Sequence, residues 1–180
     1  MFKSIKDKKV LITGASGGIG SCMALLFAEH QAIVGIHHHH GKEEAENLVR
    51  QVEKNRGRAA SFQADLVSDA GNILIRSFVD LFGGIDILIN NAGAVFGPKD
   101  ILELDSMSWE STFRLNTQAP FFLAQSAFLF MKNNGGGKII NISSISAKYG
   151  GSDRTLHYAA SKAALEAINL GLAKAGASQN

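Results

Sequence analysis

Disulfides, long apolar runs and an excess of one charge are all missing from this sequence. Among 180 residues there is one cysteine, Cys22, so no internal disulfide can form. No apolar run reaches the length of a membrane span, and the first six residues lack the apolar core of a signal peptide. The 18 Lys and Arg residues against 16 Asp and Glu give a net charge of +2, without a basic cluster. We therefore expect a cytoplasmic protein that binds neither membranes nor nucleic acids.

The composition is that of a globular protein with a single core. Apolar residues make up 46% of the chain and charged residues 19%. The length is enough for one domain and too short for two, so residues 1–180 are predicted to form one unit. Repeats and low-complexity tracts are absent apart from four consecutive histidines at 37–40. Cys22, on the first predicted helix, is interpreted as a small buried hydrophobe rather than a reactive thiol.

The rest of the chain is organised around residues 9–20, with the sequence KVLITGASGGIG. Residues 10–13 predict a short buried strand, glycines follow at once, and residues 21–30 predict a helix. Glycine lets the backbone approach a diphosphate closely, and the helix N-terminus offers free N–H groups. The spacing is Gly-x-x-x-Gly-x-Gly, not the strict Gly-x-Gly-x-x-Gly pattern. This segment alone leaves two interpretations open, a phosphate site or a glycine-rich turn without a ligand.

Strands and helices alternate along the whole sequence. The continuous apolar run at 85–89 is typical of a parallel strand that is covered on both faces. Alternation with short connections predicts an α/β fold, a Rossmann-like doubly wound parallel sheet with helices on both faces. Further strands are expected at 32–36, 59–63 and 138–142, and further helices at 43–54, 71–82, 105–132 and 157–174, with Ser106 or Ser108 as the cap of the long helix.

Two pairs of residues suggest specific chemistry. Tyr158 and Lys162 are four residues apart, so they project from one helix face. An ammonium beside a phenol favours the phenolate, which makes the tyrosine a candidate acid or base. Pro120 lies inside the long helix and has no N–H to donate to the carbonyl of Asn116, so we expect a kink there. A surface Tyr and Lys at helical spacing, and a kink without function, are the alternatives.

Taken together, the motifs resemble those of the short-chain dehydrogenase/reductase family, in order, from about residue 8 to the last residue. The motifs are the glycine segment, Asn-Asn-Ala-Gly at 90–93, Asn116, the Ser143–Ser144 pair and the Tyr-x-x-x-Lys of Tyr158 and Lys162. The resemblance implies that Tyr158 is the acid/base and that Ser144 orients the substrate oxygen. It also implies that the carbonyl of Asn116 holds a water in a proton relay. The Ser144–Tyr158 spacing is one residue longer than is usual in the family, so Ser146 is a weaker candidate for the serine.

The resemblance also implies which residues hold the dinucleotide. Asp65 matches the family position that accepts from the adenine amino group, and residues 91–93 match those lining the adenosine and ribose. The predicted cofactor-binding residues are Gly14, Ser16, Gly18, Ile19, Gly20, His37, Asp65, Leu66, Asn91, Ala92, Gly93, Tyr158 and Lys162.

The end of the second predicted strand bears on the choice of cofactor. NAD enzymes usually place Asp or Glu there for the ribose 2′-hydroxyl. This chain has histidines at 37–40, and its next acid is Glu43. The missing acid favours NADP(H) over NAD(H), although neutral imidazoles are mediocre phosphate partners. A metal site in the histidine run is not expected, because adjacent strand residues face alternately.

These observations lead us to expect an NAD(P)(H)-dependent oxidoreductase that interconverts a carbonyl and an alcohol. By family analogy the substrate is a small molecule such as a 3-oxoacyl thioester, a sugar or polyol, or a steroid-like ketone. A non-catalytic dinucleotide-binding module is the main alternative, and a methyltransferase on a similar fold is a weaker one. Family members continue with further strands and a substrate loop and form homo-oligomers. We therefore expect a truncated family member whose last strand is an unprotected edge.

Overall fold

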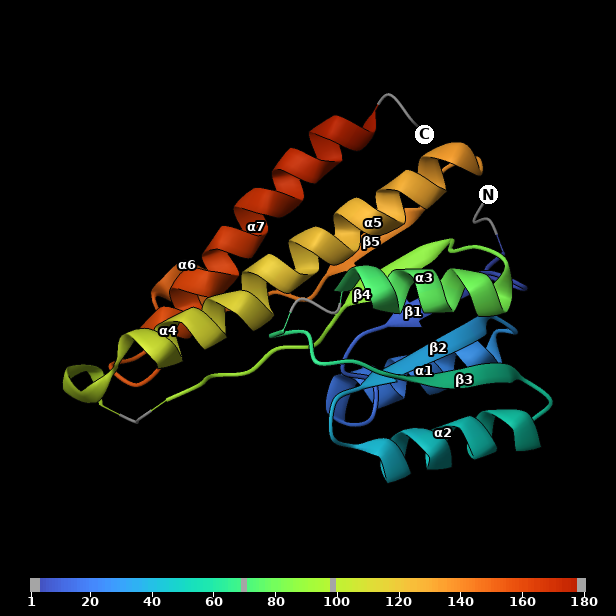
Figure 1. Cartoon of the computed structure of the whole chain (residues 1–180), viewed down its shortest axis with the longest axis horizontal. Helices are drawn as coiled ribbons and strands as arrows, with labels where there is room; N and C mark the ends of the chain where they lie inside the picture. The colour runs from blue at the N-terminus through green and yellow to red at the C-terminus, as the bar shows by residue number, and fades with distance from the viewer. Residues whose placement is uncertain (1–3, 69–70, 98–99, 178–180) are drawn as a thin grey trace.

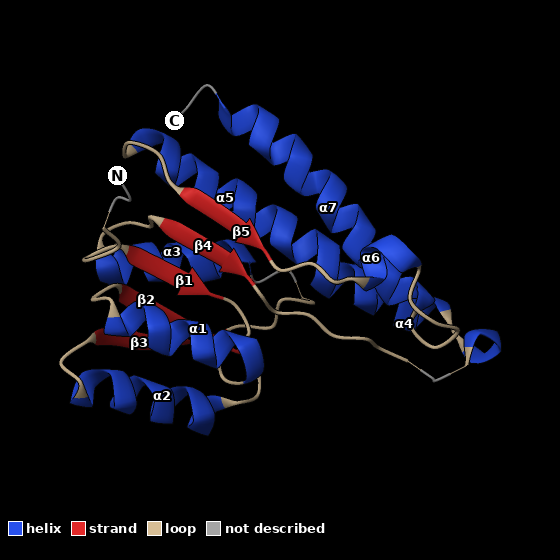
Figure 2. Ribbon diagram, turned by 180° about the vertical axis from the view of Figure 1, so that it is seen from behind, coloured by secondary structure: helices blue, strands red, loops and turns tan. Residues whose placement is uncertain are grey.

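The computed structural model describes residues 4–68, 71–97 and 100–177. Its centre is a five-stranded parallel sheet with the strand order β3-β2-β1-β4-β5 (Figures 1 and 2). This is the predicted Rossmann-like arrangement, in which the order reverses beside β1. The strands are β1 (Lys9–Ile12), β2 (Ile33–His38), β3 (Arg58–Gln63), β4 (Ile87–Asn90) and β5 (Lys138–Asn141). The last three residues of the chain, 178–180, lie outside the described residues.

Helices cover both faces of the sheet (Figure 2). On one face α1 (Gly18–Glu29) and α2 (Lys42–Lys54) pack on alternate residues of β1 and β2. On the other, α3 (Gly71–Phe82) and α5 (Ala119–Asn133) pack on Leu11 and Leu88. All four residues of β4 are buried, as expected for a central parallel strand. The two layers hold the carboxyl ends of the strands at a common edge, where the site lies.

The long helix predicted at 105–132 is divided. It consists of α4 (Ser106–Phe113), a π-helical turn η2 (Arg114–Gln118) and α5. The π-helical turn lies just before Pro120, where the kink was predicted. A proline has no N–H and cannot continue the regular hydrogen bonds of an α-helix. The predicted cap is wrong: the Asp105 carboxylate, not Ser106 or Ser108, is the cap and accepts the N–H of Ser108. A carboxylate at this position also interacts favourably with the helix dipole, and this hydrogen bond lowers the pKa of Asp105.

Two further expectations differ from the structure. Cys22 is exposed, so its interpretation as a buried hydrophobe is wrong. On α1 the buried side belongs to Gly20 and Ala24, and Cys22 lies two residues from each, on the other side of the helix. β2 extends two residues beyond the expected end, so His37 and His38 belong to the strand. Both of these histidine side chains are buried.

At one edge of the sheet, β5 pairs with β4 alone and has alternating half-buried and exposed residues. After β5 the chain forms a short helix, α6 (Ser146–Tyr149), which the sequence did not predict, and then α7 (Leu156–Gly176). α7 runs beside α5 (Figures 1 and 2). A short 3₁₀ turn, η1 (Ile101–Glu103), precedes α4. In the described part of the chain no helix is both long and apolar enough to cross a membrane.

Candidate active site

A cavity of about 570 Å³ opens at the carboxyl ends of β1 to β4. Ligands of open α/β sheets bind at this edge, where the strand order reverses. Seven of the predicted cofactor-binding residues line the cavity, while Ser16, Gly18, Ile19 and Gly20 lie in the adjoining turn and first helix. The seven are Gly14, His37, Asp65, Leu66, Asn91, Ala92 and Gly93.

The glycine turn has the close packing that a dinucleotide site requires. Gly14 has a φ of +62°, and a Cβ there would lie 2.9 Å from the Cα of Ala92. A Cβ on Gly20 would lie 2.5 Å from the Gly14 carbonyl oxygen. Gly17 caps α1 without a side-chain hydrogen bond, and neither it nor Gly18 has a neighbour that would block a ligand. The helix N-terminus is thus open to a phosphate, and the turn fits a dinucleotide diphosphate.

Thr13 and Asn91 tie the glycine turn to the end of β4. The Thr13 hydroxyl accepts the backbone N–H groups of Asn91 and Ala92, both at 3.0 Å. In return, the Asn91 side chain donates to the carbonyls of Thr13 at 2.9 Å and Gly14 at 3.1 Å. These bonds fix two adjoining loops that both line the cavity.

His37 is used in a way that the sequence did not predict. The Gly14 N–H donates to its Nδ1 at 3.0 Å, so Nε2 carries the proton and donates to the Ala64 carbonyl at 3.1 Å. Burial lowers the pKa of His37 to about 4, which keeps the ring neutral. Because both ring nitrogens bind backbone groups, His37 holds the cavity wall together. The exposed histidines of the run that line the cavity are His39 and His40.

Asp65 lies on the same side of the cavity as these histidines. Its Oδ1 accepts the Val67 N–H at 3.0 Å and is 4.0 Å from Nε2 of His39. The rings of His39 and His40 have centroids 3.6 Å apart, and their planes are tilted by 35°. Within the described residues, no group of three His, Cys, Asp or Glu side chains is placed to hold a metal ion.

Tyr158 and Lys162 lie on one face of α7, as their spacing predicts. The Lys162 Nζ is 5.8 Å from the centre of the Tyr158 ring. The lysine side chain is buried, and its Nζ donates to the Ile142 carbonyl at the end of β5 at 2.8 Å. Burial lowers the pKa of the ammonium. The geometry therefore places a fixed donor beside a half-buried phenol.

Asn116 lies in the π-helical turn and is fully buried. Its side chain makes a paired contact with the backbone of Ala94: Nδ2 donates to the carbonyl at 2.8 Å, and Oδ1 accepts the N–H at 3.0 Å. Nδ2 also donates to the Ser161 hydroxyl on α7 at 3.2 Å. In the turn, the Ala119 N–H bonds to the Arg114 carbonyl, five residues back. The backbone around Asn116 is thus displaced from regular helical bonding.

Gly93 is where the cavity meets these catalytic candidates. A Cβ on Gly93 would lie 2.9 Å from Oδ1 of Asn116 and 3.2 Å from Nζ of Lys162. Gly93 itself lines the cavity. Gly93 therefore lies between the cavity and the side chains of Asn116 and Lys162. Because it has no Cβ, a ligand in the cavity can come close to both side chains.

The two serines after β5 have different environments. The Ser143 hydroxyl donates to Oε1 of Glu166 on α7 at 2.8 Å, so it is directed at the helix. The Ser144 hydroxyl accepts the backbone N–H of Ser146 at 3.2 Å and makes no hydrogen bond with Tyr158. In this hydrogen bond the Ser144 oxygen is the acceptor, so its O–H remains able to donate to a substrate oxygen. Ser146 itself begins α6, the short helix that lies between Ser144 and Tyr158.

Sequence reasoning missed several residues that support the site. The Ser161 hydroxyl links Asn116 to the Tyr158 carbonyl, to which it donates at 2.7 Å. His157 is buried, and its Nε2 lies 2.8 Å from the Phe96 carbonyl. Ser161 could have been found from its position three residues after Tyr158, on the same helix face. No sequence signal distinguishes the partner of His157, which comes from a distant loop.

The chain matches known proteins over nearly its whole length. A family model described as short chain dehydrogenase matches residues 8–180. The chain is 34% identical over 166 residues to a hydroxynaphthalene reductase-like protein Arp2 of Metarhizium guizhouense, covering 91% of this chain and 61% of the relative. It is 39% identical over 171 residues to an uncharacterized oxidoreductase of Thermotoga maritima, covering 94% and 66%. The chain thus spans less than two thirds of the length of these relatives.

Solved structures with the same fold contain dinucleotides. A short chain dehydrogenase from Burkholderia cenocepacia in complex with NADP superposes with a TM-score of 0.91 at 31% identity, covering 98% of this chain and 71% of that one. The NADH-dependent reductase A1-R′ complexed with NAD gives a TM-score of 0.90 at 30% identity, covering 97% and 75%.

Proposed function

Because the chain belongs to the short-chain dehydrogenase family, we propose that it is an NAD(P)(H)-dependent oxidoreductase that interconverts a carbonyl and an alcohol. The observation that supports this most directly is the junction at Gly93. There the cavity beside an open helix N-terminus meets Asn116 and Lys162. A cavity for a dinucleotide next to a tyrosine that can transfer a proton is the minimum that such a reaction needs.

The bound dinucleotide would supply the hydride, and the protein would supply the proton. Tyr158 gives its phenolic proton to the substrate oxygen, or takes one from the alcohol in the reverse direction. Lys162 is held by the Ile142 carbonyl and stabilises the phenolate by its charge. Ser144 hydrogen-bonds the same substrate oxygen. The backbone carbonyl of Asn116, in its π-helical turn, holds a water in a proton relay toward Lys162.

We also propose that NADP(H) is preferred to NAD(H). The residues that follow β2 carry no carboxylate until Glu43 in α2, so nothing there repels a 2′-phosphate. His39 and His40 line that part of the cavity and can donate to a phosphate. Titration with NADPH and with NADH, followed by fluorescence, measures the preference. Tighter binding of NADH would contradict it.

For the substrate we propose a ketone such as a 3-oxoacyl thioester, on the strength of the family resemblance. The test is the oxidation of NADPH, followed at 340 nm, with acetoacetyl-coenzyme A and with an aromatic 1,2-diketone. Tyr158→Phe should lower kcat by roughly 10²–10⁴-fold while leaving cofactor binding nearly unchanged. Tyr149→Phe is the matched control, because that side chain is 78% exposed. Binding of the dinucleotide without turnover of any carbonyl would instead indicate a non-catalytic binding module.

A further inference from the structure

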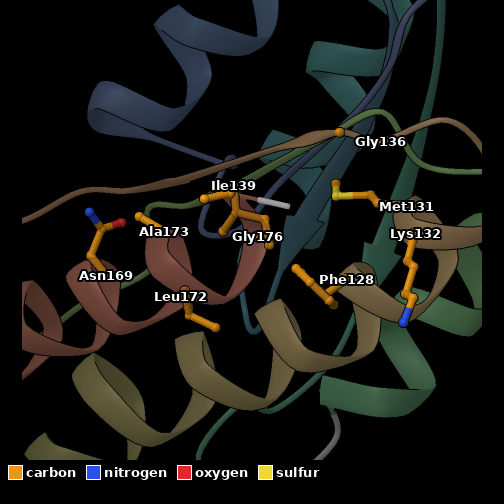
Figure 3. Close-up of a pocket in the computed structure, with 11 residues that line it drawn as sticks. Phe128, Met131, Lys132, Gly136, Ile139, Asn169, Leu172, Ala173 and Gly176 are labelled. Atoms are coloured by element: carbon orange, nitrogen blue, oxygen red, sulfur yellow. The ribbon is translucent and has the colours of Figure 1, made fainter. Parts of the chain in front are cut away.

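The helix that carries Tyr158 has few features that fix its position by apolar packing alone. Between Tyr158 and Asn169 the buried positions of α7 are Ala159, Ser161, Lys162 and Leu165, and of these only Leu165 is a large apolar side chain. Small side chains form shallow ridges, which interlock less than large ones. Further along, a cavity of about 330 Å³ separates α7 from α5 and β5 (Figure 3). The C-terminal half of α7 is therefore not tightly packed against the sheet.

Polar groups replace this packing. Three consecutive residues, the last residue of β5 and the two that follow it, each hydrogen-bond to α7. Their partners on the helix are spaced by four and three residues, which places them on one face. Tyr158 lies four residues before the first partner, on the same face. The bonds are Lys162 Nζ to the Ile142 carbonyl at 2.8 Å, Ser143 Oγ to Glu166 Oε1 at 2.8 Å, and Asn141 Nδ2 to Asn169 Oδ1 at 2.9 Å.

The outermost of these bonds continues into the core. Asn141 also accepts from Nδ2 of Asn90, its register partner on β4, at 2.8 Å. Asn90 is 2% exposed and donates in addition to the Pro120 carbonyl at 3.2 Å. Figure 3 shows Asn169 at the wall of the cavity, directed toward β5. α7 is thus tied through amides to β4 and to the start of α5.

The Ser143–Glu166 bond is the strongest candidate for setting the position of the helix. It is part-buried, and its acceptor is a carboxylate, which makes it stronger than a neutral hydrogen bond. It also joins the two halves of the candidate active site. Ser143 adjoins Ser144, and Glu166 lies one helical turn beyond Lys162. A shift of α7 along β5 would change the Ser144–Tyr158 distance, because both tyrosine and lysine move with the helix.

We propose that Ser143 and Glu166 are positioning residues that fix the register of α7 on β5 and thereby place Tyr158 opposite Ser144. This inference rests on the proposed function, because Tyr158 is taken as the acid. A slide by one residue displaces the phenol by about 1.5 Å along the helix axis. Misplacement of a reacting group by about 1 Å can lower the rate by about 10²-fold.

The proposal is tested with Ser143→Ala, Glu166→Ala and the double variant, compared with wild type in the reduction of an aromatic 1,2-diketone by NADPH. Each single change should lower kcat by about tenfold to 10²-fold, with KM for NADPH unchanged, because the misplaced group is the acid. The double variant should be no slower than the worse single variant, since the two act through one bond. Glu166→Gln keeps an acceptor oxygen and should restore most of the rate. Glu53→Ala, an exposed glutamate on α2, is the control.

Two outcomes would overturn the proposal: independent, multiplying effects of the two single changes, or equal rates for Glu166→Ala and wild type. A second readout does not depend on turnover. In ¹⁵N-labelled protein the backbone amide signals of Tyr158 and Ser161 should shift from their wild-type positions in Ser143→Ala and should keep those positions in Glu53→Ala. Unchanged signals would also overturn the positioning role. If wild type does not bind NADPH, the result counts against the proposed function. The amide signals still test whether Ser143 and Glu166 fix the register of α7 on β5.

Discussion

Acidification should loosen the glycine turn through one histidine. His37 is 2% exposed, and its two ring nitrogens join the Gly14 N–H to the Ala64 carbonyl. The Nδ1 atom accepts a hydrogen bond there, so a proton on Nδ1 would face the Gly14 N–H instead of accepting from it. Protonation must therefore break the link between β2 and the turn that precedes α1.

The size of this effect follows from the pKa of the ring. Burial lowers the pKa of His37 from 6.5 to about 4, so between these values the unfolded chain binds the proton that the folded chain excludes. The contribution to stability is complete above pH 6.5 and is lost as the pH falls toward 4. The loss relative to pH 7 is about 2 kcal/mol at pH 5 and about 3 kcal/mol at pH 4. Set against a typical net stability of about 5–15 kcal/mol, this is a large fraction.

Urea unfolding at pH 7 and pH 5 measures the effect. His37→Gln keeps a donor and an acceptor but does not titrate, so its loss of stability on acidification should be about 2 kcal/mol smaller than that of wild type. His30→Gln, a change at an exposed histidine, is the control and should behave as wild type. Burial also lowers the pKa of His38, but that contribution is common to all three proteins. Equal acid sensitivity of His37→Gln and wild type would refute the reasoning.

Two further predictions concern packing and association. Gly93→Ala should lower turnover at least tenfold and stability by about 1–3 kcal/mol, because its Cβ would lie 2.9 Å from Oδ1 of Asn116. Gly171→Ala is the control, since its Cβ meets nothing within 4 Å; full activity of Gly93→Ala would show that the junction is loose. The 180-residue chain should associate or be poorly soluble through the free edge of β5, where Ile140 is 41% exposed. Sedimentation should show less association for Ile140→Lys, and a monomeric wild type would contradict this prediction.

The parts of the fold that the sequence predicted correctly depend on local pattern. The strands followed from short apolar runs, and the division of the long helix followed from Pro120, whose missing N–H acts wherever the residue lies. The Tyr158–Lys162 face followed from helical spacing. Each of these inferences needs only neighbours along the chain.

The errors and omissions depend on contacts between distant segments. Cys22 was expected inside because of its residue type, but the rotation of α1 on the sheet decides which face is buried. The role of His37 depends on Gly14 and Ala64, which lie in different loops. In the sequence Glu166 has no feature that distinguishes it from other helix residues, and its bond to Ser143 forms only because α7 packs beside the end of β5. Such pairings are properties of the assembled sheet and helices rather than of any sequence window.

The most direct test of the proposed function is transfer of deuterium from NADPH labelled at C4 of the nicotinamide to a carbonyl substrate. With each of the two C4 epimers in turn, the alcohol formed by wild type should carry one deuterium on its carbinol carbon from one epimer and none from the other. Tyr158→Phe should bind the dinucleotide with similar affinity and transfer deuterium at least 10²-fold more slowly. Tight binding of NADPH by wild type with no deuterium in any alcohol would contradict the assignment as an oxidoreductase.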